Sequence, residues 1–193
     1  MKHKRFEPEI KNEYQKGFLF GNRIPKDYFI AKGKGESNIT IHAGSYHLAL
    51  KNAGIEMCNI MTYSSILPSI AREIKRPKKL IHGSVMETIM AVANSSKGER
   101  ATAGIIFGML YNKISGEKYG GLVCEYNGSL TEAECKKQLS MSLNELYING
   151  YSKKFNLKNI KCITKTITPR KKYGTSIVAL CFLNYLFKIE KTR

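Results

Sequence analysis

The sequence predicts an α+β domain built mostly from antiparallel strands. Apolar stretches of strand length recur along the chain and are separated by turn signals such as Asn127-Gly128. Two segments far apart in the chain show apolar residues at helical spacing, and residues 85–92 taken alone could also form a helix. Strands in runs with few helices are typical of helices layered on an antiparallel sheet.

The first part of the chain predicts an extension, two short strands and a helix. Residues 1–22 mix lysine, glutamate and aromatics without a period, so we treat them as a basic N-terminal extension. A strand is expected at 27–32, a glycine-rich bend at 33–36 and a second strand at 39–41. Residues 45–53 carry an apolar stripe at helical spacing, with Ser45 as the expected N-cap and Gly54 as the C-cap.

A strand at 57–63 follows and ends at a Ser64-Ser65 pair closed by Pro68. Residues 69–80 are charged and broken by proline, which indicates a surface loop. Apolar stretches at 84–93, 101–111 and 119–126 are separated by turn residues and predict an antiparallel meander.

The C-terminal part predicts a long helix and two strands. Thr131 and Glu134 have capping-box spacing, and apolar residues then recur at helical spacing up to Gly150. Strands are expected at 159–168 and 175–187. The last one is almost continuously apolar, so it should be central or covered on both faces.

Length and composition fit one globular domain with a full core. The 32 Lys+Arg against 15 Asp+Glu give a net charge of +17, but no aromatic-basic interleaving accompanies them, so a solvated surface is favoured over nucleic-acid binding. No apolar run reaches the roughly 18 residues of a membrane span, and a cytoplasmic location is expected. The five cysteines are widely spaced and predict neither disulfides nor a metal site.

Five motifs follow one another along the chain: NAGI at 52–55, SSILP at 64–68, HGSVMETIMA at 82–91, GLVCEYNG at 121–128 and ALCFLN at 179–184. In this order and spacing they resemble the pyruvoyl-dependent arginine decarboxylases, and the chlamydial members more than the archaeal ones. The resemblance runs from about residue 25 to about residue 187.

The resemblance implies a self-cleaving enzyme with a covalent pyruvoyl cofactor, without pyridoxal phosphate or metal. Ser65 Oγ would attack the carbonyl of Ser64, dividing the chain into a β chain (1–64) and an α chain (65–193) that begins with the pyruvoyl group. That group would form a Schiff base with the amino-acid substrate, arginine giving agmatine and CO2. Glu125 is then the expected proton donor, and Asn59 matches a family residue near the pyruvoyl group.

One position departs from the family pattern. His47 falls where the arginine enzymes carry the aspartate that faces the guanidinium, and histidine cannot form a bidentate carboxylate pair. Glu36 and Glu56 are the nearest acids by sequence that could replace it. A different amino acid as substrate, or an inactive paralogue that binds an anionic partner, therefore stays open.

The resemblance also implies an architecture and an assembly. The fold would be a four-layer αββα sandwich of mostly antiparallel sheets, formed by residues 23–193. The expected assembly is a homotrimer or a dimer of trimers, with active sites between subunits.

Overall fold

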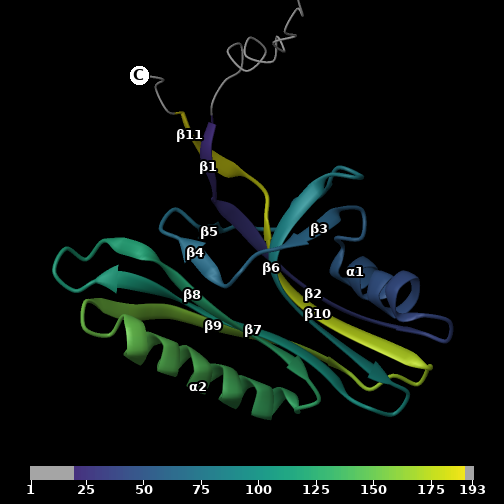
Figure 1. Cartoon of the computed structure of the whole chain (residues 1–193). Coiled ribbons are helices and arrows are strands. Elements are labelled where there is room, and N and C mark those ends of the chain that lie inside the picture. The colour runs from purple at the N-terminus through teal and green to yellow at the C-terminus, as the bar shows by residue number, and fades with distance from the viewer. Residues whose placement is uncertain (1–19, 190–193) are drawn as a thin grey trace, which may run out of the picture.

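The computed structural model describes residues 20–189, which form two β-sheets packed face to face with a helix on each outer face (Figure 1). This is the αββα sandwich that we expected. The elements in chain order are β1 (Phe20–Pro25), β2 (Asp27–Ser37), the π-helix η3 (Ile41–Tyr46), α1 (His47–Ala53), β3 (Asn59–Thr62), β4 (Ile66–Pro68), β5 (Arg72–Glu73), β6 (Val85–Ser96), β7 (Ala101–Asn112), β8 (Lys118–Gly128), α2 (Glu132–Gly150), β9 (Phe155–Ile167), β10 (Tyr173–Phe182) and β11 (Tyr185–Ile189).

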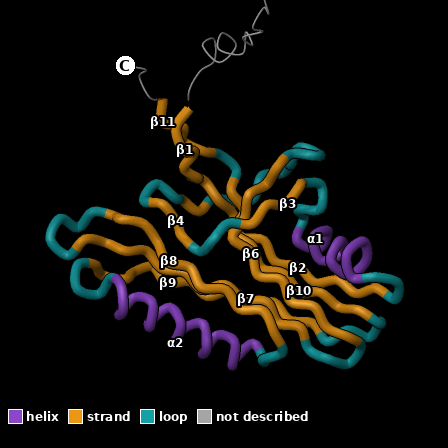
Figure 2. The backbone as a smooth tube through the Cα atoms, viewed as in Figure 1, coloured by secondary structure: helices purple, strands orange, loops and turns teal. Residues whose placement is uncertain are grey.

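The two sheets divide the strands unequally. One sheet has the order β3-β6-β10-β2-β5 and the other the order β4-β8-β7-β9. Neighbouring strands are antiparallel except β3 with β6 and β2 with β5. The paired strands β1 and β11 form a two-stranded ribbon that projects from the sandwich (Figure 2). Residues 1–19, most of the expected extension, lie outside the described residues, and residues 20–22 begin β1.

Strand β10 shows why the last long apolar run is central. It lies between β6 and β2, and every residue from Gly174 to Phe182 is buried. Because strand side chains alternate, Ile177 and Ala179 pack toward α1, whereas Val178 and Leu180 pack into the core between the sheets. Both faces are therefore covered, as the sequence predicted.

Helix α2 also follows its sequence signals. Glu134 N donates to Thr131 Oγ1 at 3.3 Å, and Thr131 N donates to Glu134 Oε2 at 2.8 Å, which completes the capping box. Leu139 and Leu143 lie one turn apart and are buried against the outer face of the β7–β8–β9 sheet. The helix is thus fixed by its cap and one apolar stripe.

The predicted bend at 33–36 is wrong, because β2 runs straight through it. Gly33 and Gly35 lie where the helical segment crosses the strand closely. A Cβ on Gly33 would stand 2.1 Å from Ala49 O, and one on Gly35 2.4 Å from Ser45 O. The glycines therefore permit close packing of helix on strand rather than a turn.

The helix also begins earlier than expected. The residues predicted as a strand at 39–41 lead instead into η3, so Ser45 is not an N-cap but lies within the helical segment. Its Oγ donates to Ile41 O at 3.4 Å and lies 2.9 Å from Thr175 Oγ1 on β10. Gly54 does end α1, with φ at +71° as a left-handed C-cap requires.

The expected meander is half right. β7 and β8 form the predicted antiparallel hairpin, but β6 belongs to the other sheet and pairs with β10 and β3. The turn between β6 and β7 therefore passes from one sheet to the other. Periodicity alone could not show this, because a strand buried on both faces has the same apolar pattern in either sheet.

Candidate active site at the Ser64-Ser65 turn

The Ser64-Ser65 turn connects the two sheets. It follows β3, an edge strand of one sheet, and precedes β4, an edge strand of the other. Tyr63 N donates to Thr88 O on β6 at 2.7 Å, and Val123 N on β8 donates to Ser65 O at 3.1 Å. The peptide bond between the two serines is thus anchored on both sides, while the Ser64 side chain is exposed.

A tight turn is centred on Ser65. Ile66 N donates to the carbonyl oxygen of Ser64 at 3.0 Å, which closes a three-residue turn. This carbonyl is the group that Ser65 would attack. A backbone N–H already donates to the oxygen on which negative charge would develop.

The Ser65 hydroxyl donates a hydrogen bond to the carboxylate of Glu125. Its Oγ lies 2.8 Å from Oε1 and 2.7 Å from Oε2 of Glu125, and both residues are half-buried. Glu125 is on β8, opposite Ile105 of β7, so the sheet holds it in place. A carboxylate that accepts the hydroxyl hydrogen can also accept its proton.

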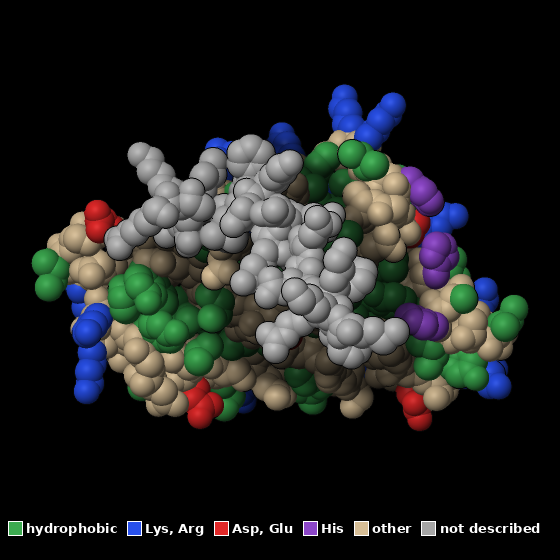
Figure 3. Space-filling view, turned by 45° about the horizontal axis from the view of Figure 1, so that its top comes forward, with side chains coloured by type: hydrophobic (Ala, Val, Ile, Leu, Met, Phe, Trp, Pro, Cys, Tyr) green, Lys and Arg blue, Asp and Glu red, His purple; other side chains and the backbone are tan. Residues whose placement is uncertain are grey.

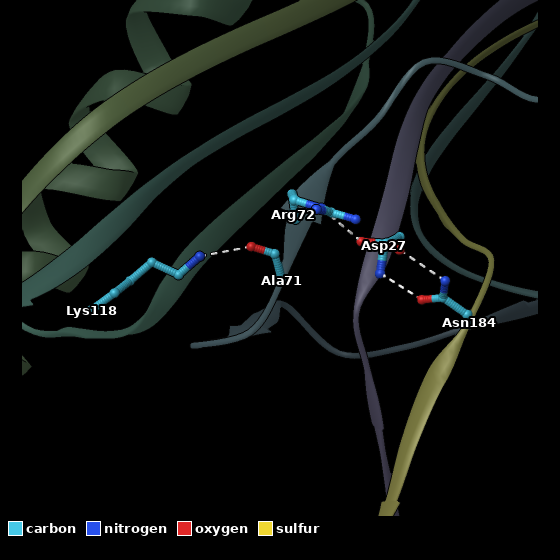
Figure 4. A network of polar contacts seen from close by, with 5 residues as sticks. All are labelled: Asp27, Ala71, Arg72, Lys118 and Asn184. Atoms are coloured by element: carbon cyan, nitrogen blue, oxygen red, sulfur yellow. Dashed lines mark hydrogen bonds and ion pairs between the residues drawn. The ribbon is translucent and has the colours of Figure 1, made fainter.

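The chain that leaves the turn is tied to both sheets (Figure 4). After β4, Arg72 Nε donates to Asp27 Oδ1 at 3.0 Å, and Lys118 Nζ on β8 donates to Ala71 O at 2.7 Å. Asn184 Nδ2 donates to Asp27 Oδ2 at 2.8 Å. The hydrogen bond from Asn184, followed by that from Arg72, holds the pKa of the Asp27 carboxyl below its usual value.

A second carboxylate lies near the turn, and our reading of the sequence missed its role. Glu87 on β6 is buried, accepts a hydrogen bond from the hydroxyl of Tyr63 and forms an ion pair with Arg23 of β1. The available signal was a single acid inside an otherwise apolar strand, because a buried carboxylate requires partners.

Asn59 is not brought next to Ser65 within the chain. It begins β3, at the opposite end of the strand from the turn, and its side chain is exposed. Its Nδ2 donates to Gly83 O at 2.9 Å. This bond joins β3 to the segment that enters β6.

The expected substrate-binding residues also lie apart from Ser65. The carboxylate of Glu36 accepts hydrogen bonds from the backbone of Arg170 at 2.7 Å and of Lys171 at 3.3 Å, which hold its pKa below the usual value. Glu56 is half-buried in the loop between α1 and β3. His47 begins α1 and is exposed.

His47 borders an open, mostly apolar hollow of about 480 Å³, lined also by His42 and Tyr46. The π-helical turn places His42 and His47 five residues apart on the same side. Histidine side chains lie together on one side of the molecule in Figure 3. The hollow is open to the surface, and neither Ser65 nor Glu125 is among the residues that line it.

Neither a metal site nor a membrane helix is found in the part of the chain that the structure describes. No group of three or more His, Cys, Asp or Glu side chains in residues 20–189 could hold a metal ion. No described helix is long and apolar enough to cross a membrane.

Comparison with known proteins identifies relatives across most of the chain. Residues 27–187 match the family model described as pyruvoyl-dependent arginine decarboxylase. The enzyme of that name, AaxB, from Chlamydia caviae is 33% identical over 190 residues, which covers 86% of this chain and 94% of the relative. AaxB from Chlamydia trachomatis serovar L2 is also 33% identical with the same coverage. An archaeal pyruvoyl-dependent arginine decarboxylase, from Thermococcus sibiricus, is 27% identical over 164 residues, covering 83% of this chain and 97% of the relative.

Proposed function

Because the chain belongs to the pyruvoyl-dependent arginine decarboxylase family, we propose that it is an amino-acid decarboxylase that converts L-arginine to agmatine and CO2. Its covalent cofactor is the pyruvoyl group of that family. We assign the origin of this group to Ser65. The observation that carries the assignment is the contact of Ser65 Oγ with both oxygens of Glu125 at 2.8 and 2.7 Å.

The first reaction is cleavage of the chain itself. Ser65 Oγ adds to the carbonyl carbon of Ser64 while Glu125 accepts the hydroxyl proton. The C–N bond between the two residues breaks, the nitrogen gains a proton, and Ser64 becomes an ester of Ser65. Elimination frees the Ser64 carboxylate, and hydrolysis with loss of ammonia converts residue 65 into the pyruvoyl group. The products are a β chain (1–64) and an α chain (65–193).

The fold supports this reaction in three ways. The Ile66 N–H donates to the Ser64 oxygen on which charge develops, Glu125 accepts from the attacking hydroxyl, and anchors on both sheets hold the turn. A serine hydroxyl is otherwise a weak nucleophile. These groups fit a residue 65 that is converted into a prosthetic group.

In the second reaction the pyruvoyl group supplies an electron sink for the loss of CO2. Glu125 remains beside residue 65 on β8 after cleavage. Once it has gained a proton it can deliver that proton to the substrate carbon that lost CO2. One carboxylate would thus act first as a base and later as an acid.

We propose that the active unit is an assembly, a homotrimer or a dimer of trimers. Both strands that flank the turn are edge strands, and exposed apolar side chains lie along them at Met61 and Ile66, with Val85 also exposed at the start of the neighbouring β6. Such side chains favour contact with another protein surface. In this arrangement His47, Glu56 and Asn59 would reach the Ser65 site of a neighbouring copy. Light scattering on the purified protein would measure the number of copies.

The experiment that tests this function combines mass and activity. Intact-mass analysis should show two fragments that join at Ser64/Ser65, with a pyruvoyl N-terminus on the larger one. Arginine labelled at the carboxyl carbon should release labelled CO2. Ser65→Ala should abolish both, whereas Ser69→Ala, in the exposed turn after β4, should alter neither. A wild-type chain that stays intact and releases no CO2 would contradict the proposal.

A further inference from the structure

The buried carboxylate of Glu87 is the feature that the function described above does not yet use. Glu87 is 2% exposed and lies on the same side of β6 as Ile89 and Ala91, which face the core between the sheets. A buried carboxylate is costly unless it is paired and hydrogen-bonded. Its two partners therefore determine what it does.

The first partner is Tyr63, the residue directly before the serine pair. The Tyr63 hydroxyl donates to Oε2 of Glu87, and the Tyr63 backbone N–H donates to Thr88 O at 2.7 Å. Its ring packs against that of Phe182 with centroids 5.7 Å apart. Tyr63 is thus held at its backbone, ring and hydroxyl, so little freedom is left at the residue preceding Ser64.

The second partner is Arg23 of β1, which pairs with Oε1 of Glu87 and lies 5.6 Å from the centre of the Tyr185 ring. Arg23 thus provides the cation that pairs with the buried carboxylate. The Tyr185 hydroxyl is also buried in this cluster, next to Tyr63. Burial, followed by the proximity of Tyr63, raises the pKa of Tyr185 to about 12, so its hydroxyl stays neutral.

We propose that Glu87 is a positioning residue for self-cleavage, which through the Tyr63 hydroxyl sets where the Ser64 carbonyl lies relative to Ser65 Oγ. The inference rests on the proposed function. Glu87 contacts no reacting atom, since its effect passes through Tyr63. Misplacement of reacting groups by about 1 Å lowers rates by up to about 100-fold, so loss of this link should be measurable.

The test follows cleavage of the full chain during cell-free synthesis, with intact mass measured at successive times. We expect Tyr63→Phe, which removes only the hydroxyl, and Glu87→Gln, which removes the charge, to slow cleavage roughly 10-fold or more. The double variant should be no slower than the slower single variant, because both changes break the same link. Arg23→Lys should retain more of the rate than Arg23→Gln, because it keeps the cation.

Tyr147→Phe is the matched control. It also removes a single hydrogen-bonded hydroxyl, which donates from α2 to Phe155 O at 2.9 Å, away from Glu87 and Tyr63, so cleavage should proceed at the wild-type rate. Thermal unfolding of Ser65→Ala chains that carry each change would report their stability separately. A merely structural role would lower the unfolding temperature and leave the cleavage rate of folded protein unchanged, and that result would overturn the proposal.

Two further results would also overturn it. One is cleavage at the wild-type rate in Tyr63→Phe and in the Arg23 variants. This result contradicts the proposal even if Glu87→Gln does not fold. The other is strictly additive slowing in the double variant. If the wild-type chain and the Tyr147→Phe control both stay intact, the proposed function fails and this inference fails with it. Cleavage of those two with unaltered rates in the other variants contradicts only the role of Glu87.

Discussion

Ser65 Oγ lies within hydrogen-bonding distance of both carboxylate oxygens of Glu125, although 60 residues separate the two in sequence. β4 pairs with β8 in the register Ile66 to Leu122, which brings the turn before β4 alongside the end of β8 that carries Glu125. In the reaction that we propose, the sheet thus places the nucleophile against the acceptor of its proton. A single residue pair can serve both cleavage and turnover.

Replacing Glu125 with glutamine should impair both reactions. An amide cannot accept the Ser65 proton as a carboxylate does, nor return one to the substrate carbon. Loss of a general acid or base lowers rates by about 10²- to 10⁴-fold, and we expect a decrease of that order in CO2 release per cleaved chain. Intact mass would report the cleavage rate and labelled arginine the turnover.

Glu145→Gln is a suitable control for that variant, since Glu145 is exposed on α2 and loses the same charge. It should cleave and decarboxylate like the wild type. Normal cleavage of Glu125→Gln with lost turnover would restrict Glu125 to the second reaction. Normal decarboxylation by Glu125→Gln would exclude Glu125 from the active site.

His47→Ala should raise KM for arginine with little change in kcat, if His47 contacts substrate in a neighbouring copy. A contact that is equally strong in the ground and transition states changes KM alone. We expect an increase of roughly 3- to 10-fold, equivalent to about 0.6–1.4 kcal/mol. His82→Ala, which alters an exposed loop residue, is the control, and equal KM values for the two variants would exclude His47 from substrate binding.

Gly33→Ala should destabilise the protein. The added Cβ would stand 2.1 Å from Ala49 O and 2.8 Å from Ala53 N, both backbone atoms of α1, so helix and strand must separate. Overpacking of this kind costs about 1–3 kcal/mol. Denaturant unfolding would measure it. Gly150→Ala, whose Cβ would meet nothing within 4 Å, should show no such loss.

Glu36→Gln should make stability less dependent on pH in the acid range. The backbone N–H of Arg170, followed by that of Lys171, lowers the pKa of Glu36 in the folded state from the ordinary value of 4.5. The charged carboxylate therefore stabilises the fold above about pH 4.5, and this contribution is lost as the pH falls through the lower folded-state pKa. Wild type should be more stable than the variant at pH 7, and the difference should shrink below pH 4.5. A stability difference between wild type and variant that stays constant with pH would contradict a stabilising role for the hydrogen bonds that Glu36 accepts from Arg170 and Lys171.

Local signals in the sequence predicted the helices and the long strands well. The capping box of Thr131 and Glu134, the left-handed Gly54 and the apolar run of β10 each depend on near neighbours or on simple periodicity, and each is confirmed. The bend at 33–36 failed because a glycine required by a distant helix looks the same in sequence as a glycine required by a turn. The meander is right for β7 and β8 but wrong for β6, because pairing of β6 with β10 joins segments about 80 residues apart.

The sequence by itself determined the fold class, through the pattern of apolar stretches and turns. It also indicated the family and Ser64-Ser65 as the candidate cleavage site, through the resemblance of several motifs in order. The tertiary structure decided which groups surround that site. It brought the Glu125 carboxylate within hydrogen-bonding distance of the Ser65 hydroxyl. It also joined Tyr63 and Arg23 through the Glu87 carboxylate, and it placed Asn59 and Glu36 in other parts of the fold. These relationships arise from strand register and from the crossing between two sheets, which bring together side chains that no local pattern connects.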